Sequence, residues 1–214
     1  MSGASGTIVV VDDDQVFRRS MEQFLRAAGY EARSFASAKE FLASPHPDSP
    51  TCVLVDLRMP EMSGLELQEA LSRAGRRHAL VFVSGHGDVK ATARAMRSGA
   101  IDFIEKPYEE SDLLAAIERA LARDRRDREQ EATRSDARRR LARLSGAEKV
   151  VCELIAEGLR TKEVAAKLGK AESTVKMQRW TAMSKLGVST PVGVARLLEL
   201  AGGHGSDSAA KDQG

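Results

Sequence analysis

The sequence predicts an α/β protein with a doubly wound, five-stranded parallel sheet, followed by a small all-α domain that contains a helix-turn-helix. Over the first 122 residues, short apolar runs alternate with amphipathic stretches of helical length. This is the pattern of parallel strands covered by helices. After residue 143 the pattern changes to short helices only, and a highly charged segment separates the two parts.

Five apolar runs are the expected strands, and three of them are nearly all apolar, as expected for strands buried on both faces. They are Thr7–Val11, Glu31–Phe35, Cys52–Asp56, Ala79–Ser84 and Ile101–Glu105. The amphipathic stretches between them predict helices that cover the sheet. These are Gln15–Ala28, Ala38–Ala43, Gly64–Ala74, Asp88–Ser98 and Ser111–Arg123.

Residues 123–143 are rich in arginine and acidic side chains. A heptad pattern that continued from Leu121 would next use Asp124 and Arg128, so the apolar seam stops and a sustained coiled coil is not expected. A charged helical extension and a flexible linker both fit this composition.

Four short helices are expected in the second part. Ser145 and Glu148 form a capping box ahead of the first. The others are Lys162–Leu168, capped by Thr161 and ended by Gly169; Thr174–Leu186, capped by Ser173 and ended by Gly187; and a helix from Pro191 to about Ala201. A tight turn at Gly169–Glu172 gives the second and third helices the spacing of a helix-turn-helix.

We therefore expect the sheet domain at residues 1–122, a charged linker at 123–143, the helical domain at 144–203 and a disordered tail at 204–214. The net charge of +2 is uneven: residues 1–122 carry −4, residues 123–143 carry +4 and the remainder carries +2. An acidic first part suits a cation or phosphate site, and a basic second part suits a polyanion such as nucleic acid.

No apolar run approaches the roughly 18 residues that span a bilayer, and Met1–Gly6 lacks the features of a signal peptide. We expect a cytoplasmic protein without a membrane partner. Cys52 and Cys152 have no metal-ligand spacing, so we expect both to be reduced packing residues.

Polar residues gather where the expected strands end. They are Asp12, Asp13 and Asp14 after the first strand, Asp56 at the end of the third, Ser84 at the end of the fourth and Lys106 after the fifth. All would lie at one edge of a parallel sheet, where such folds bind ligands. Carboxylates held together repel one another unless a cation such as Mg2+ joins them. One carboxylate could then attack a phosphoryl group, which Lys106 and Ser84 would neutralise and bond.

The runs VVVDDD, VLVDLRMPEMSG, VFVSGHGD and GAIDFIEKPY appear in this order, and residues 7–122 closely resemble the receiver domain of two-component response regulators. The resemblance implies that Asp56 is the phosphoacceptor. It also implies that Mg2+ is bound by Asp56, by Asp13 directly, by Asp12 in the outer shell and by the backbone carbonyl of Arg58.

The same resemblance gives Ser84 and Lys106 a contact with the phosphoryl group, and makes Ser84 and Phe103 the switch residues. Phe103 would otherwise be an ordinary core aromatic. The Lys106–Pro107 bond is expected to be cis. His86 would overlook the phosphoryl site and could tune hydrolysis.

The segment from LSGAEKVV to STPVGV, within residues 144–200, resembles the LuxR-type DNA-binding domain of FixJ-like response regulators. Thr161 stands where many members have Asn, and Gln178 where many have His. The third helix would read the major groove, and Val175, Ala182, Met183 and Leu186 form its apolar packing stripe. The expected DNA contacts are Lys176, Met177, Gln178, Arg179, Trp180 and Lys185 on this helix, with Thr161 and Ser173 meeting phosphates at helix starts. Trp180 could instead pack in the core or contact a small molecule.

The two resemblances together imply a transcription factor. A sensor histidine kinase would phosphorylate Asp56, the face formed by the fourth strand, fourth helix and fifth strand would respond, and a homodimer would bind double-stranded promoter DNA. RNA polymerase is a further candidate partner. Val194, Leu197 and Leu198 of the last helix could pair in that dimer or close the domain core.

Two alternatives remain open at this point. A Mg2+-dependent phosphohydrolase would need a general acid or base, for which the sequence offers only His86 and Glu61, so we expect autodephosphorylation and no enzyme turnover. A phosphate sink or partner-binding module would have a second domain that no longer binds DNA.

Overall fold

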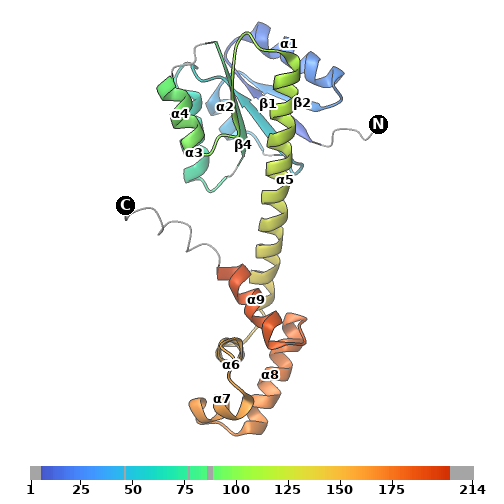
Figure 1. The fold of residues 1–214 in the computed structure, drawn as a ribbon, viewed down its shortest axis with the longest axis vertical. Coiled ribbons are helices and arrows are strands. Elements are labelled where there is room, and N and C mark those ends of the chain that lie inside the picture. Colours follow the sequence, from blue (N-terminus) through green and yellow to red (C-terminus); the bar gives the residue numbers. More distant parts are fainter. Residues whose placement is uncertain (1–5, 46, 77, 86–88, 203–214) are drawn as a thin grey trace. The chain divides into compact units, whose positions relative to one another are not determined.

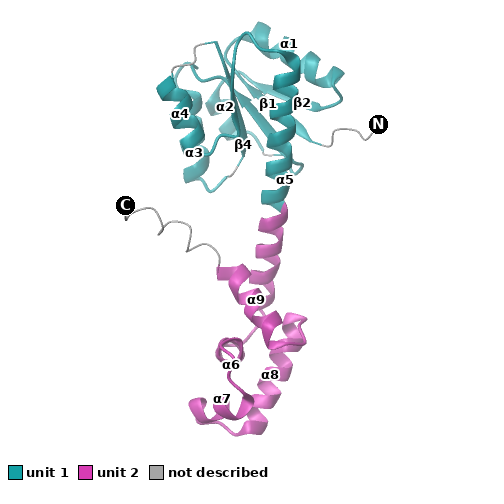
Figure 2. Ribbon diagram, viewed as in Figure 1, with its two compact units in different colours: residues 1–128 teal, residues 129–214 magenta. Residues whose placement is uncertain are grey.

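The computed structural model describes residues 6–45, 47–76, 78–85 and 89–202. The chain divides into two compact units, residues 1–128 and 129–214 (Figure 2). The position of His86 and the tail after residue 203 lie outside the described residues.

Within the described residues of the first unit, five parallel strands form one sheet in the order β2-β1-β3-β4-β5 (Figure 1). The predicted α/β class is confirmed. The strands are β1 Thr7–Val11, β2 Glu31–Phe35, β3 Thr51–Val55, β4 Ala79–Ser84 and β5 Asp102–Glu105. The strand order reverses direction between β1 and β3, which is the position where such sheets bind ligands.

Helices cover both faces of the sheet, and successive residues of each central strand face opposite sides, as the period of two requires. They are α1 Gln15–Ala27, α2 Ala38–Ala43, α3 Gly64–Arg73, α4 Val89–Arg97 and α5 Glu110–Leu141. Ile8 and Val10 of β1 pack in one core with α1 and α5. Val9 and Val11 pack in the other core with α2, α3 and α4.

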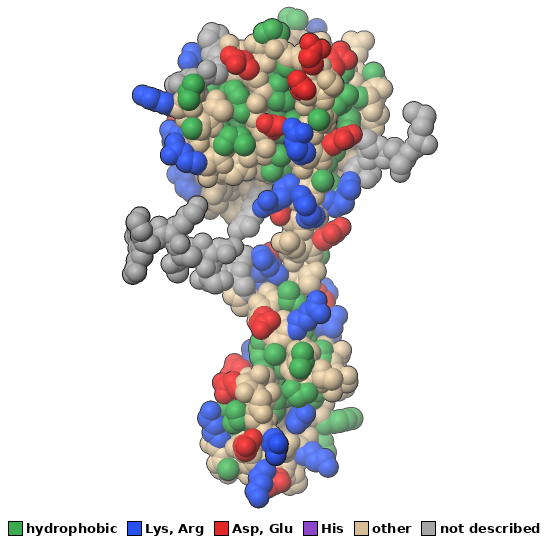
Figure 3. Space-filling view, in the orientation of Figure 1, with side chains coloured by type: hydrophobic (Ala, Val, Ile, Leu, Met, Phe, Trp, Pro, Cys, Tyr) green, Lys and Arg blue, Asp and Glu red, His purple; other side chains and the backbone are tan. Residues whose placement is uncertain are grey.

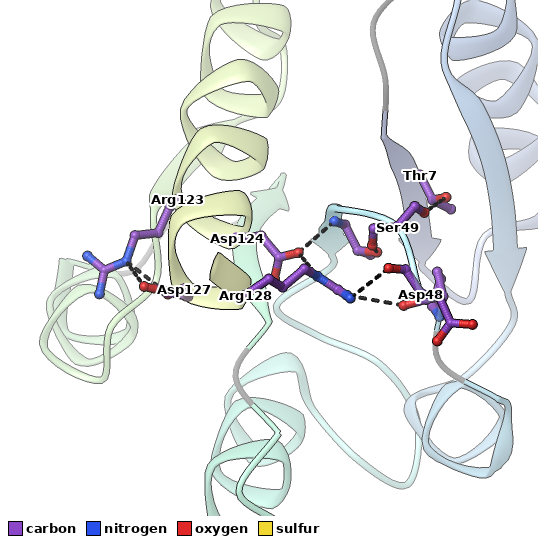
Figure 4. Close-up of polar contacts among 9 residues, drawn as sticks. Thr7, Asp48, Ser49, Arg123, Asp124, Asp127 and Arg128 are labelled. Atoms are coloured by element: carbon purple, nitrogen blue, oxygen red, sulfur yellow. Dashed lines mark hydrogen bonds and ion pairs between the residues drawn. The ribbon is translucent and has the colours of Figure 1, made fainter. Parts of the chain in front are cut away.

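The helix α5 continues through the charged segment as a single helix of 32 residues, so the helical extension is the alternative that the structure takes. Its apolar contacts with the sheet end at Leu121. One turn later, Asp124 is only 3% exposed and accepts hydrogen bonds from the backbone N–H of Thr51 at 2.9 Å and from Arg128 Nε at 2.6 Å. Arg128 also donates to the carbonyls of Pro47 and Asp48 (Figure 4). Asp124 and Arg128 therefore extend the contacts of α5 beyond the apolar seam, to the start of β3 and the residues before it.

The described residues of the second unit form the helices α6 Gly146–Ala156, α7 Thr161–Leu168, α8 Glu172–Leu186 and α9 Pro191–Gly202, besides the end of α5. The capping box of Ser145 and Glu148 at the start of α6 is confirmed. Gly169 and Gly187 end α7 and α8 in the left-handed conformation, as predicted.

The predicted caps of α7 and α8 were wrong. Thr161 is the first residue of α7, because the Glu163 carboxylate accepts from the backbone N–H of Arg160 and starts the helix one residue earlier. The helix α8 begins at Glu172, so Ser173 lies in its first turn and Ala171 is the N-cap.

Buried side chains from α6, α7, α8 and α9 form the core of this unit. Val194 is fully buried there, so it closes the core rather than offering a dimer contact. Cys52 and Cys152 are both buried and free, each within a core. Among the described residues, no helix combines the length and the apolar character needed to cross a membrane.

Candidate functional sites

The carboxyl ends of the strands bring the expected polar residues of the first unit to one edge of the sheet. The backbone N–H of Asp56 donates to the carbonyl of Val11 at 2.9 Å, which places Asp56 beside the end of β1. The backbone N–H of Lys106 donates to the carbonyl of Ser84 at 2.9 Å, which joins the ends of β4 and β5. The sheet geometry therefore gathers residues that lie as much as 94 positions apart in the chain.

The three consecutive aspartates have different environments. Asp12 is 3% exposed, and its Oδ1 accepts from the backbone N–H of Asp14 at 2.8 Å. Asp13 is exposed. Asp14 is the N-cap of α1 and accepts from the backbone N–H groups of Val16 and Phe17. Asp12 is thus buried at the sheet edge, Asp13 faces solvent and Asp14 caps α1.

Asp56 lies half-buried just past the end of β3, and its Oδ2 accepts from the backbone N–H of Arg58 at 2.8 Å. The pKa of Asp56 lies above its ordinary value, mainly because burial disfavours the charged carboxylate. The hydrogen bond from Arg58 opposes this shift, while the negative charge of Asp12 adds to it. The positive charge of Lys106 and a hydrogen bond with Ser84 also lower the pKa. Asp56 is thus a carboxylate that burial and a like charge destabilise.

The ammonium group of Lys106 lies between an acid and an aromatic ring. Its Nζ is 3.1 Å from Asp12 Oδ2 and 3.4 Å from the centroid of the Phe17 ring. Phe17 was not among the predicted site residues, because it lies outside the recognised motifs and is followed by two arginines. Its position in the first turn of the helix that follows the aspartates is the signal that could have indicated it.

A magnesium ion is the group that this edge would hold. In the part of the chain that the structure describes, no three acidic, histidine or cysteine side chains converge closely enough to enclose an ion. The donor chemistry nevertheless fits Mg2+, because the Asp12 carboxylate is close enough to raise the pKa of Asp56, and Asp13, next to Asp12 in the chain, is exposed. Asp12 and Asp56 supply carboxylate oxygen atoms at the edge, and Asp13 is exposed to solvent beside Asp12.

Two further features shape the edge. Phe103 on β5 is half-buried, and its ring stacks on that of Phe82 with the centroids 6.1 Å apart. Gly64, at the start of α3, is the second residue that sequence analysis missed. A Cβ atom at Gly64 would lie 2.4 Å from the carbonyl oxygen of Asp56, so only glycine allows α3 to approach the end of β3 this closely.

The second candidate site is the exposed face of α8. Val175, Ala182, Met183 and Leu186 are buried, which confirms the predicted packing stripe. Lys176 is exposed, and Met177 and Trp180 are 63% and 69% exposed, so the core position considered for Trp180 was wrong. Lysine, arginine, acidic and hydrophobic side chains share the face of this unit seen in Figure 3.

Other predicted DNA contacts already have partners within the unit. Arg179 is half-buried and donates to Thr161 Oγ1 at 3.4 Å, which ties α8 to the start of α7. Gln178 Oε1 accepts from Lys170 at 3.4 Å. Ser173 is exposed in the first turn of α8.

Lys185 lies in the last turn of α8, about 20 Å along the helix from its start at 1.5 Å per residue. Its Nζ is 2.8 Å from both carboxylate oxygens of Glu148, which also accepts from the backbone N–H of Ser145. Hydrogen bonds from Lys185 and Ser145 hold the pKa of Glu148 below its ordinary value. The structure thus places the predicted DNA contact Lys185 in an ion pair that joins α8 to α6.

Residues 8–118 match the response regulator receiver domain, and residues 142–198 match the bacterial regulatory proteins of the luxR family. Nodulation protein W of Bradyrhizobium diazoefficiens is 40% identical over 195 residues, which cover 91% of this chain and 86% of that protein. The transcriptional regulatory protein FixJ of Azorhizobium caulinodans is 36% identical, with 94% and 95% covered.

Solved structures are also similar to this chain. The response regulator StyR is 40% identical with a TM-score of 0.81, and the match covers 92% of this chain and 99% of that one. Full-length FixJ from B. japonicum is 33% identical with a TM-score of 0.54, covering 92% and 97%.

The chain therefore belongs to the response regulators that join a receiver domain to a LuxR-type helix-turn-helix domain. It is a two-component response regulator and transcription factor, a phosphoacceptor signalling protein and not a catalytic enzyme. Its receiver domain implies a histidine kinase as partner, and its second domain implies DNA binding.

Proposed function

We propose that this protein accepts a phosphoryl group on Asp56 from a sensor histidine kinase and then binds promoter DNA as a homodimer. The observation that carries the proposal is the sheet edge, where Asp56 stands beside Asp12 and the ammonium group of Lys106. A half-buried carboxylate, a second acid beside it and a nearby cation are groups that phosphoryl transfer to a carboxylate can use. The kinase and the DNA place this activity in the cytoplasm.

Mg2+ would be held by Asp13 and Asp56, by the backbone carbonyl of Arg58 and, through water, by Asp12. When bound, it supplies the charge that offsets the repulsion between the carboxylates and the incoming phosphoryl oxygens. The chain itself orients the acceptor, because the backbone N–H of Arg58 donates to Oδ2 of Asp56.

Lys106 and Ser84 are the proposed contacts of the phosphoryl oxygens. Ser84 is the last residue of β4, and Lys106 directly follows β5. The charge of Lys106 and a hydrogen bond with Ser84 both lower the pKa of Asp56. A shift of Ser84 toward the phosphoryl group would open space at the end of β4, where Phe103 stacks on Phe82. Phe103 is therefore the proposed residue that carries the change to the surface of β5.

The face of α8 is the proposed reader of the major groove. Lys176, Met177 and Trp180 are exposed on its first turns, where they can reach base edges and phosphates. Gln178 and Arg179 would also contact DNA after exchanging their present partners. The list of proposed phosphate contacts is completed by Thr161 and Ser173, whose backbone N–H groups lie in the first turns of α7 and α8.

A dimer follows from the size of this interface. One small helix-turn-helix makes few phosphate contacts, so its affinity is weak at physiological salt. Two linked domains make the second binding event intramolecular, and the site should contain two half-sites. RNA polymerase is the further partner that a DNA-bound regulator would meet.

The experiment is a gel shift of genomic promoter fragments with the wild-type protein and with Asp56→Asn, each with and without a small phosphodonor and Mg2+. We expect phosphodonor to strengthen the shift of the wild type and to leave the variant unchanged. Wild-type protein that binds no genomic fragment in either state would support the phosphate sink instead.

A further inference from the structure

We propose that Phe17 is a positioning residue that holds the ammonium group of Lys106 in a resting position, without an ion pair to Asp56, until a phosphoryl group draws it across the sheet edge. The inference rests on the proposed contact between Lys106 and the phosphoryl group. It adds an aromatic residue that sets how readily this contact forms.

The geometry is that of a cation over an aromatic face. Lys106 Nζ lies 3.4 Å from the centroid of the Phe17 ring, well within the roughly 6 Å over which a cation is attracted to a ring. The side chain of Lys106 is 26% exposed and that of its acid partner Asp12 is 4% exposed. Because little water screens the ammonium group here, the attraction is stronger than at a fully exposed site.

The loop that presents the acids also fixes the ring. Asp14 caps α1 by accepting from the backbone N–H of Phe17, and Arg18 donates to the backbone carbonyl of Asp12 at 2.6 Å. Phe17 packs against the core that α1 and α5 share with the sheet. The ring therefore has a defined place relative to Asp12, and the two groups together define where the ammonium group rests.

In this resting place the ammonium group is near Asp56 but forms no ion pair with it. Among the described residues, Lys106 forms its ion pair with Asp12, and it acts on Asp56 as a nearby positive charge without an ion pair. To bond a phosphoryl oxygen on Asp56, the ammonium group must give up part of its contact with Asp12 and with the ring. An interaction made only in the resting state shifts the equilibrium toward that state.

The expected size follows from the strength of such contacts. A loss of the ring should favour the phosphoryl-bound arrangement by about fivefold, which corresponds to roughly 1 kcal/mol. Phe17→Leu should therefore lower, by about this factor, the concentration of phosphoryl mimic at which the protein dimerises. Phe17→Trp, with the stronger cation-binding face, should raise it.

The experiment uses the full chain with Mg2+ and beryllofluoride as the phosphoryl mimic, and follows dimerisation by sedimentation. Phe24→Leu is the matched control, since Phe24 lies on the same helix and packs against the same core without contacting Lys106. Its midpoint should equal that of the wild type. Replacing Phe17 with a trifluorinated phenylalanine keeps the ring's shape and weakens its negative face, so it should act like Phe17→Leu even if that variant folds poorly.

A second readout tests the resting geometry without Mg2+ or mimic. In protein labelled at the lysine ε carbons, the Lys106 ε-methylene protons should be shifted upfield by the Phe17 ring. The shift should disappear in Phe17→Leu, persist in Phe24→Leu and decrease when the mimic is added.

The outcomes separate the inference from the function on which it rests. If the wild type does not respond to the mimic, the proposed function fails. If the wild type responds but the fluorinated and leucine variants respond at the same concentration, the role of Phe17 is wrong and the function stands. An unshifted Lys106 resonance in the resting protein would also overturn the inference.

Discussion

The edge of the receiver sheet and the exposed face of α8 hold their charged side chains in opposite ways. At the sheet edge, Asp12, Lys106 and the backbone of Arg58 already bond to groups within the domain. On α8, Lys176 and Trp180 stand in solvent. A phosphoryl group must therefore exchange existing bonds, which moves the residues around it, whereas DNA can meet the first turns of α8 with less rearrangement. The difference explains how one domain can act as a switch and the other as a reader.

Loss of the phosphoacceptor should have the strongest effect on the switch. Asp56→Asn should abolish acid-labile phosphorylation and leave the fold intact, because the amide oxygen can still accept from the backbone N–H of Arg58. Uptake of label from a small phosphodonor with Mg2+ is the measurement. Asp112→Asn, on the exposed first turn of α5, is the control that should be labelled normally. Normal labelling of Asp56→Asn would move the acceptor elsewhere.

The second prediction asks whether every buried acid of this domain belongs to the switch. Asp124 is buried and bonds to Arg128 (Figure 4) and to the backbone N–H of Thr51. Thr51 is the first residue of β3, whereas Asp56 follows the last, so the two acids lie at opposite ends of this strand. Asp124→Ala should lower the free energy of unfolding by about 2–3 kcal/mol, because the N–H of Thr51 loses its acceptor, and phosphorylation should remain.

Asp127→Ala is the matched control for Asp124. Asp127 pairs with Arg123 on the same helix, and both side chains are partly exposed. Its loss should cost less than about 1 kcal/mol. Urea unfolding followed by far-UV circular dichroism compares the two variants. Equal midpoints would show that the Asp124 contacts do not anchor α5.

The third prediction concerns the reader. Lys176→Ala should weaken DNA binding by about 1–3 kcal/mol if Lys176 bonds a base, or reduce the salt slope by about one unit if it bonds a phosphate. Labelling of Asp56 should not change. Lys149→Ala, which removes an exposed lysine from α6 of the same domain, is the control. Unchanged affinity, specificity and salt slope in Lys176→Ala would place the reading face elsewhere.

The smallest effect on DNA binding is expected at Lys185. Its side chain is already paired with Glu148, as the charged groups of the sheet edge are paired, whereas Lys176 is exposed. Lys185→Met should lower the stability of the second domain more than its affinity for DNA. Lys185 holds the pKa of Glu148 below its ordinary value. The ion pair therefore stabilises the fold fully at pH values above the ordinary pKa of a glutamate, and this stabilisation is lost as the pH falls through the lowered pKa of Glu148. Urea midpoints of variant and wild type should therefore converge in acid. A difference that stays constant down to low pH would contradict this role.

The sequence was sufficient for the features that follow from periodicity and topology. A parallel sheet brings the carboxyl ends of its strands to one edge, so Asp12, Asp56 and Lys106 could be placed together without coordinates. The buried stripe of α8 was predictable for the same reason, because helical spacing alone decides which side chains share a face.

Contacts that depend on side-chain direction or on distant partners were not predictable. The sequence places Phe17 in the first turn after the aspartates, but it does not show that Lys106 turns toward this ring. It also does not show that Asp124 meets the backbone of Thr51 across 73 positions. The predicted cap at Thr161 failed because the Glu163 carboxylate accepts from the backbone N–H of Arg160 and begins α7 one residue earlier. The helix α8 also begins earlier than predicted, at Glu172, without a side-chain cap. Sequence rules for helix caps identify several possible N-cap residues, and the hydrogen bonds and packing of the folded chain decide which one is used.

We propose that a phosphoryl group at the sheet edge raises DNA affinity by making dimers. The most direct measurement titrates a selected genomic site, intact and with one half-site removed, against protein with and without beryllofluoride, beside sedimentation of the same samples. We predict that the mimic produces dimers and raises affinity for the intact site by on the order of 10²–10⁴, with little gain on the single half-site. A protein that stays monomeric yet gains its full affinity on the single half-site would contradict the claim.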